Sequence, residues 1–147
     1  MSDSEIPWAK PYFDHEELEE VKGSFETGWL SMGSKVKEFE EVMAGLVGAR
    51  HAVAVTNGTV ALDLAMKVLE IGPGDEVIVP AMTYFSSASA VSYQGATPVF
   101  VDVDSTTFNL DPKRIQEAVT TKTKAILFID YGGNPAAFDQ ISEIGQI

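Results

Sequence analysis

After Arg50 the sequence alternates between short apolar runs and amphipathic stretches, and this alternation constrains the fold more than any other feature. The runs are rich in Val, Ile and Phe, as is typical of strands that are covered on both faces of a sheet. They lie at residues 51–55, 76–80, 97–103 and 125–130. The stretches between them predict helices at about residues 59–69, 86–93 and 112–119. Strand–helix–strand repetition predicts right-handed parallel crossovers, and so an α/β fold with a mainly parallel sheet and helices on both faces.

The first 50 residues predict two helices. Apolar residues at helical spacing predict a buried face on the first helix and a single apolar stripe on the second, and a glycine after each set predicts its end. In the first helix the apolar residues are Leu18, Val21 and Phe25, followed by Gly28. In the second they are Val36, Phe39, Val42, Met43 and Leu46, followed by Gly48. Acidic side chains cluster near the start of the first helix, where we interpret them as a solvated face.

Composition excludes several classes of function. The net charge is −12, from 10 Lys and Arg against 22 Asp and Glu, which argues against nucleic acid or an anionic membrane as the main partner. The chain has no Cys, and its two histidines, His15 and His51, are far apart, so no metal site is predicted. No apolar run is long enough to span a membrane, and the first residues lack the pattern of a signal peptide. We therefore expect a cytoplasmic protein without a membrane segment.

The end of the sequence predicts a truncated chain. Phe138, Ile141, Ile144 and Ile147 have the spacing of an amphipathic helix, and the chain stops on the last of them. A crossover helix needs a following strand, and none is present in the sequence.

Ligands of open α/β sheets bind beyond the carboxyl ends of the strands, so we examined the loops that follow the apolar runs. Asn57, Gly58 and Thr59 follow the first run and precede a predicted helix. Glycine allows close backbone approach, and the first N–H groups of a helix are unpaired, so this turn can bind a phosphate. The alternative is an ordinary turn with Asn or Thr as the helix cap. The spacing does not match the loops that bind nucleoside triphosphates or NAD.

Two further loops carry residues suited to binding. Tyr84 follows the second run, where its ring can stack on a planar ligand; the alternative is an aromatic of the core or its rim. Tyr131 lies in a loop with an acid and two glycines after the last run; the alternative is a simple turn. Asp102 and Asp104 alternate with valine, and we interpret them as the solvated end of a strand.

Read as an ordered series, the motifs resemble one enzyme family. They are FE (39–40), GARHAVAVTNGTVAL (48–62), IGPGDEVIVPAMTYFSSASAV (71–91), GATPVFVDVD (95–104) and TKTKAI (121–126). The order and spacing resemble the DegT/StrS-type nucleotide-sugar aminotransferases, which are pyridoxal-phosphate (PLP) enzymes of the aspartate aminotransferase fold, fold type I. The resemblance extends from about Trp8 to Ile147. It implies that this chain is the N-terminal part of the large, cofactor-binding domain of such an enzyme.

The resemblance also implies roles for particular residues. The cofactor-binding residues would be Asn57, Gly58, Thr59 and Tyr84, with the first three at the phosphate and the ring of Tyr84 on the pyridine. The substrate-binding residues would be Trp29, Leu30, Ser31 and Tyr131. Ala137 stands where the family commonly has Asp. Residues 1–34 would form a helical arm with a substrate-lining segment, and residues 35–147 an incomplete PLP-binding domain.

Family members are more than twice this long, and their covalent cofactor lysine lies beyond the end of this chain. The resemblance therefore implies no catalytic residue here and an inactive chain in isolation. In a full-length homodimer it implies transfer of an amino group from an amino acid, typically glutamate, to a nucleotide-linked keto sugar. Three alternatives stay open: a sugar dehydratase of the same fold, a non-catalytic regulatory homologue, and an unrelated phosphosugar-binding domain.

Overall fold

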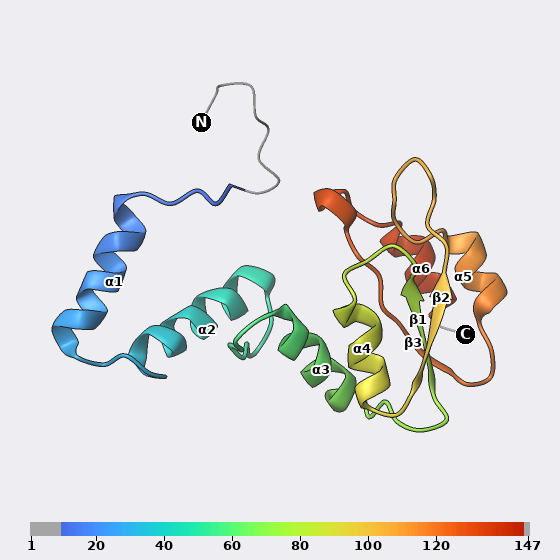
Figure 1. Cartoon of the computed structure of the whole chain (residues 1–147), viewed down its shortest axis with the longest axis horizontal. Coiled ribbons are helices and arrows are strands. Elements are labelled where there is room, and N and C mark those ends of the chain that lie inside the picture. The colour runs from blue at the N-terminus through green and yellow to red at the C-terminus, as the bar shows by residue number, and fades with distance from the viewer. Residues whose placement is uncertain (1–9, 146–147) are drawn as a thin grey trace. The chain divides into compact units, whose positions relative to one another are not determined.

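The computed structural model describes residues 10–145 and has an α/β architecture with one three-stranded parallel sheet (Figure 1). The chain divides into two compact units, Met1–Ala54 and Val55–Ile147. Among the described residues, the first unit contains two helices, and the second contains the sheet and four more α-helices. No helix of the described part is long and apolar enough to cross a membrane.

The first unit is built from α1 (His15–Thr27) and α2 (Ser34–Val47). A reciprocal capping box begins α1: the Asp14 carboxylate accepts from the Glu16 N–H, and the Glu17 carboxylate accepts from the Asp14 N–H. Both helices end at a glycine in the left-handed conformation, Gly28 and Gly48, each with φ of 68°. The two predicted helix ends are confirmed.

The predicted buried face of α1 is wrong for this structure, and side chains of the apolar stripe of α2 are exposed as well. Leu18 is 65% exposed and Phe25 is 66% exposed, and Phe39 and Leu46 of α2 are also exposed. Helical spacing determines which side chains share a face, whereas burial requires a second element to cover that face. The described residues of the first unit provide no such cover for these side chains.

In the second unit, the sheet has the strand order β2-β1-β3, with every pair parallel. The strands are β1 (Glu76–Pro80), β2 (Thr97–Val101) and β3 (Thr123–Ile126). The central strand β1 is the most buried, and Val77, Ile78 and Val79 have no exposed surface. Its position explains its unbroken apolar sequence, because a strand covered on both faces has no solvated side.

Helices cover both faces of this sheet, as predicted (Figure 1). Val77 and Val79 point to one face, where they pack in a core with residues of α3 and α4. Ile78 points to the other face and packs with residues of α5 and α6. This alternation follows from the two-residue period of a strand. The helices are α3 (Gly58–Val68), α4 (Ser86–Tyr93), α5 (Pro112–Ala118) and α6 (Phe138–Ile144).

Three of the four predicted strands form, but residues 51–55 do not. Val53 in this run is 69% exposed, and the Ala54 N–H donates to the Glu40 carboxylate at 2.8 Å. A strand needs hydrogen bonds to a neighbouring strand, and no described strand pairs with this run. Strand β1 has the predicted bounds, whereas the other two end earlier than predicted: β2 ends at Val101, and β3 ends at Ile126.

Both outer strands of the sheet, β2 and β3, have one side without a strand partner among the described residues. Strand β3 pairs with β1 on one side and has no strand partner on its other side among residues 10–145. The helix predicted near the end of the chain forms as α6, while Ile147, which the prediction included, lies outside the described residues.

Candidate functional site

The start of α3 presents backbone N–H groups to solvent. Asn57 is the N-cap, and its side-chain oxygen accepts from the Val60 N–H at 3.0 Å. The N–H groups of Gly58 and Thr59, the first two residues of the helix, have no intrahelical acceptor because of their position. A Cβ added to Gly58 would meet no atom within 4 Å. The start of α3 is therefore an open surface with a partial positive charge, suited to an anion.

Tyr84 lies in the connection between β1 and α4, two residues before α4 begins. Its side chain is 68% exposed, and its ring centroid lies 4.6 Å from that of Phe85. The neighbouring Thr83 hydroxyl is hydrogen-bonded to the Ser87 hydroxyl at 2.9 Å, which fixes the connection to the first turn of α4. Tyr84 is thus an exposed aromatic surface on an anchored backbone, which fits stacking better than a role in the core.

The helices that carry these two features pack against each other. Helix α3 contacts α4, and the Gln94 side-chain amide donates to the Asp63 carboxylate at 2.6 Å. The hydrogen bonds from Lys67 and Gln94 hold the pKa of Asp63 below its ordinary value, with burial opposing them; the largest effect comes from Lys67. The anion-binding end and the aromatic surface therefore belong to one packed body, the second unit.

Tyr131 begins a short 3₁₀ turn, η1 (Tyr131–Gly133). The two glycines of this turn have left-handed backbones, with φ of 62° at Gly132 and 80° at Gly133. The Asp130 carboxylate accepts from the Ala136 N–H at 2.8 Å and closes the loop. The loop is therefore a turn whose backbone is held by hydrogen bonds, and the interpretations as a binding loop and as a simple turn both stay open.

A buried asparagine that sequence reasoning missed also holds the Tyr131 loop. Asn109 is 4% exposed; its side-chain oxygen accepts from the Tyr131 N–H, and its amide donates to the Asn134 carbonyl, both at 2.9 Å. The only sign of it in the sequence is a polar residue between the apolar Phe108 and Leu110. Its hydrogen-bond partners are distant in the sequence, so this sign does not predict them. Asp102 and Asp104 follow the end of β2, and Asp104 accepts from two loop N–H groups, so it is more than a solvated strand end.

The loops of Tyr84 and Tyr131 leave the sheet at the same edge. Beyond the strands, the Ala81 N–H donates to the Val101 carbonyl and the Leu127 N–H donates to that of Ile78, both at 2.8 Å. In Figure 1 the arrowhead of β1, the start of α4 and the turn η1 lie at the same end of the second unit. This is the edge where parallel α/β sheets bind ligands.

Trp29, Leu30 and Ser31 belong to the first unit, in the connection between α1 and α2. The Trp29 indole N–H donates to the Met32 carbonyl at 2.9 Å, and a Cβ on Gly33 would overlap the indole. A hollow of about 330 Å³ is lined by these three residues, among others. This segment is therefore a folded, partly apolar surface.

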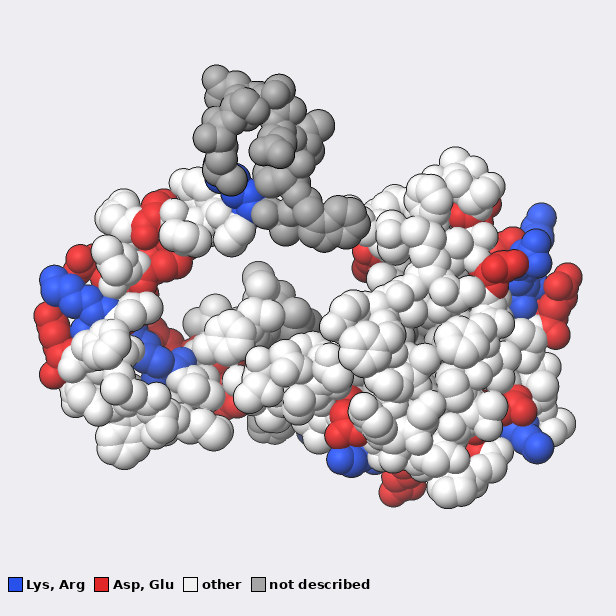
Figure 2. Space-filling view, viewed as in Figure 1, with Lys and Arg blue, Asp and Glu red and all other residues white. Residues whose placement is uncertain are grey.

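All eight lysines of the chain are exposed. Five of these lysines pair with acidic side chains: Lys22, Lys35, Lys37, Lys67 and Lys124. The hydrogen bond and charge of Glu20 raise the pKa of Lys35. On the face in Figure 2, basic side chains lie beside acidic ones without forming a continuous basic patch. Residues 10–145 also contain no cluster of His, Asp and Glu that could hold a metal ion.

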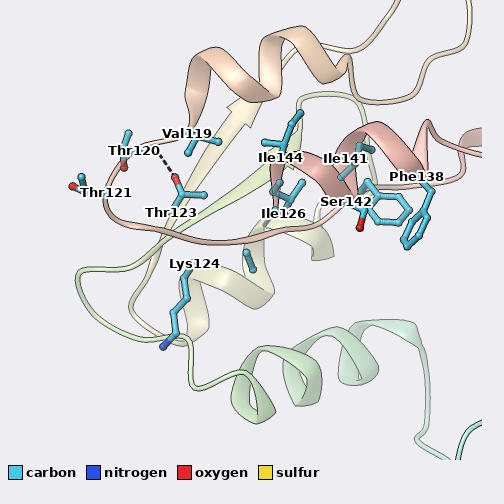
Figure 3. Close-up of a pocket in the computed structure, with 13 residues that line it drawn as sticks. Val119, Thr120, Thr121, Thr123, Lys124, Ile126, Phe138, Ile141, Ser142 and Ile144 are labelled. Atoms are coloured by element: carbon cyan, nitrogen blue, oxygen red, sulfur yellow. Dashed lines mark hydrogen bonds between the residues drawn. The ribbon is translucent and has the colours of Figure 1, made fainter. Parts of the chain in front are cut away.

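A further cavity lies elsewhere in the second unit. It measures about 740 Å³ and lies between β3 and α6, and it is lined mostly by apolar side chains such as Ile126, Ile141 and Ile144 (Figure 3). None of the residues predicted to bind cofactor or substrate lines it. Since it runs beside the open edge of β3, we interpret it as an uncovered core surface.

A parallel α/β sheet with an anion-binding helix start and an exposed aromatic at its carboxyl edge is consistent with a cofactor-dependent α/β enzyme. The chain belongs to the DegT/DnrJ/EryC1/StrS aminotransferase family, which it matches over residues 11–147. Pyridoxal phosphate is the cofactor of this family. The suspected family, the fold class and the cofactor are therefore confirmed.

Three relatives illustrate the similarity. The spore coat polysaccharide biosynthesis protein SpsC of Bacillus subtilis (strain 168) is 46% identical over 141 residues, which cover 96% of this chain and 36% of SpsC. The PLP-form of Spr1654 from Streptococcus pneumoniae has a TM-score of 0.88 and 39% identity, covering 95% of this chain and 36% of that one. GDP-4-keto-6-deoxy-D-mannose-3-dehydratase of E. coli, with bound hydrated PLP, has a TM-score of 0.89 and 34% identity, covering 95% and 38%. This chain thus spans about a third of the length of these relatives.

Proposed function

We propose that this chain is the N-terminal part of a PLP-dependent enzyme that transfers an amino group from an amino acid to a nucleotide-linked keto sugar. Glutamate is the expected amino donor. Membership of the aminotransferase family supports this proposal, as does the similarity to SpsC. The full-length protein, called the parent below, would be a cytoplasmic homodimer.

The observation that carries the proposal is the open start of α3. Because Asn57 caps the Val60 N–H, the N–H groups of Gly58 and Thr59 are left to bind the cofactor phosphate. Tyr84 would present its exposed ring to the cofactor pyridine. When bound, the cofactor draws electrons from the substrate carbon that carries the amino group, and so permits proton transfer there. The part of this chain is to bind the cofactor and to orient it.

The substrate is proposed to contact Trp29, Leu30 and Ser31 from the first 34 residues and Tyr131 from the cofactor-binding part. Residues 1–34 would then act as a substrate-lining arm, and residues 35–147 as the incomplete large domain. The indole of Trp29 and the neighbouring hollow support the first group, since ligand sites combine apolar surface with a few polar groups.

The chain is proposed to hold no catalytic residue. An amine that bonds to a cofactor must lie at the site and be uncharged, which usually requires burial or a neighbouring positive charge. All eight lysines of this chain are exposed instead, and five are paired with carboxylates. We expect the reactive lysine in the remainder of the parent.

A second candidate function is sugar dehydration on the same fold. The similarity to the E. coli dehydratase, at a TM-score of 0.89, supports dehydration as this second candidate. Both reactions would use the same cofactor surface at α3 and Tyr84. The discriminating feature is the residue that faces the cofactor in the remainder of the parent, a lysine in the aminotransferase and a histidine in the dehydratase.

Replacement of Gly58 by valine in the parent tests the phosphate site. Because a Cβ at this position meets no protein atom, we expect the fold to tolerate the change. The side chain would block close approach of the phosphate, so the PLP dissociation constant should rise about tenfold or more. Absorbance titration of the apoprotein with PLP measures this constant.

The matched control is Gly23→Val, another open helical glycine, which lies in α1. It should leave the PLP dissociation constant within about twofold of the unsubstituted value. An unchanged PLP affinity in Gly58→Val would contradict the assignment of the phosphate site.

A further inference from the structure

Asn109 makes two hydrogen bonds to the loop that carries Tyr131, one at each end of the turn. Its side-chain oxygen accepts from the Tyr131 N–H, and its side-chain amide donates to the Asn134 carbonyl. The residue is 4% exposed and no buried side-chain polar atom of the described part lacks a partner, so both groups of the amide are satisfied. A buried amide with two backbone partners fixes their separation and orientation.

The segment that carries Asn109 is itself firmly held. The Asp104 carboxylate accepts from the Thr106 and Thr107 N–H groups, and the Asp104 N–H donates to the Asn109 carbonyl, all at 2.9 Å. A bridge between Val103 and Leu110 closes the segment at its base. Asn109 is therefore held in place by its own segment, and it can in turn hold the Tyr131 turn.

Phe108 adds a side-chain contact to the same turn. Its backbone has a φ of 60°, a left-handed conformation that is costly for a bulky residue. In this conformation its ring centroid lies 5.8 Å from that of Tyr131. The segment thus contacts the Tyr131 backbone through Asn109 and the Tyr131 ring through Phe108.

We propose that Asn109 is a positioning residue that holds Tyr131 and its glycine-containing turn at the carboxyl edge of the sheet, beside the proposed substrate. The inference rests on the proposed function, because that function gives the turn a ligand. The two glycines at 132 and 133 leave the turn little rigidity of its own. Its shape therefore depends on Asn109 and on the hydrogen bond from the Ala136 N–H to the Asp130 carboxylate. Loss of Asn109 should loosen the turn without opening the sheet.

The test compares Asn109→Ala with Asn109→Asp in the parent. Alanine removes both hydrogen bonds, whereas aspartate keeps an acceptor for the Tyr131 N–H and loses the donor to Asn134. We expect amide hydrogen exchange in a peptide covering residues 128–137 to accelerate about tenfold in Asn109→Ala and less in Asn109→Asp. Exchange in residues 76–80 of the central strand should stay unchanged. The exposed substitution Gln116→Ala is the control and should alter neither peptide.

The second readout is the reaction of the PLP-loaded parent with L-glutamate. In this half-reaction, followed by absorbance as a single turnover, we expect Asn109→Ala to raise the half-saturating glutamate concentration about tenfold and to leave the limiting rate constant within about twofold, because a loosened turn weakens binding more than chemistry. Unchanged exchange in residues 128–137, or faster exchange with an unchanged half-saturating glutamate concentration, would overturn the inference while leaving the proposed function intact. Faster exchange spread to residues 76–80 in both variants would show a merely structural role and would also overturn it. An unsubstituted parent that does not bind PLP or react with L-glutamate would overturn both.

Discussion

The proposed cofactor site consists of a few residues at the start of α3 and of Tyr84, just before α4. Asn57 uses its side chain to cap the helix, which leaves the backbone of Gly58 and Thr59 free for a ligand. The Asn-Gly-Thr pattern made this predictable, because a cap and a glycine are local features of the sequence. Asn109 was not predictable in the same way, since its partners lie 22 and 25 residues further along the chain.

The role of Tyr84 can be tested by separating its ring from its hydroxyl. Among the described residues the Tyr84 hydroxyl makes no side-chain hydrogen bond, so the ring is the part available for stacking. We expect Tyr84→Ala to weaken PLP binding by about 1 kcal/mol, and Tyr84→Phe to be nearly silent. Titration of the apo-parent with PLP measures both. Equal damage in the two variants would assign the role to the hydroxyl and refute stacking.

At the scale of elements, helices were predicted more closely than strands. Helix α4 has the predicted bounds, and α3 and α5 differ from prediction by one residue. Helix hydrogen bonds are internal to the segment, so local spacing suffices to predict them. A strand depends on a partner elsewhere, and for this reason residues 51–55 read as a strand in sequence but are unpaired in the structure.

The segment from Asp104 to Leu110 should show a pH-dependent stability. Hydrogen bonds from the Thr107 and Thr106 N–H groups lower the pKa of Asp104 below its ordinary value. A lowered folded-state pKa stabilises the fold at pH values above the unfolded pKa of about 3.9, and this stabilisation is lost as the pH falls through the folded value. Asp104→Asn removes the charge and should therefore be less stable than the unsubstituted chain at pH 7.

Urea unfolding at micromolar protein concentration, between pH 3 and pH 7, measures this difference. The stability gap between the chain and Asp104→Asn should be constant above about pH 5 and should shrink below about pH 4. Asp102→Asn is a matched control, because Asp102 is an exposed carboxylate near the same strand end. A gap that stays the same down to pH 3 would show that the Asp104 charge does not hold the loop.

At the scale of the whole molecule, the chain exposes surfaces that a complete α/β domain covers. The outer edge of β3 is unpaired among the described residues, and the cavity between β3 and α6 runs beside it. The faces of α1 and α2 expose Leu18, Phe25 and Leu46. The family and fold could be predicted because the motifs are spread in order along the chain. Whether these faces are covered could not be predicted, because apolar spacing gives no information about which element packs against them.

The central claim is that this chain binds and orients PLP while the covalent lysine lies elsewhere in the parent. The most direct measurement is incubation of the parent and of the isolated chain with PLP, followed by borohydride reduction and mass-spectrometric mapping of modified lysines. The parent should carry one stoichiometric pyridoxyl-lysine outside residues 1–147, and the isolated chain only scattered, substoichiometric labels. A single stoichiometric label on any of the eight lysines of this chain would contradict the account.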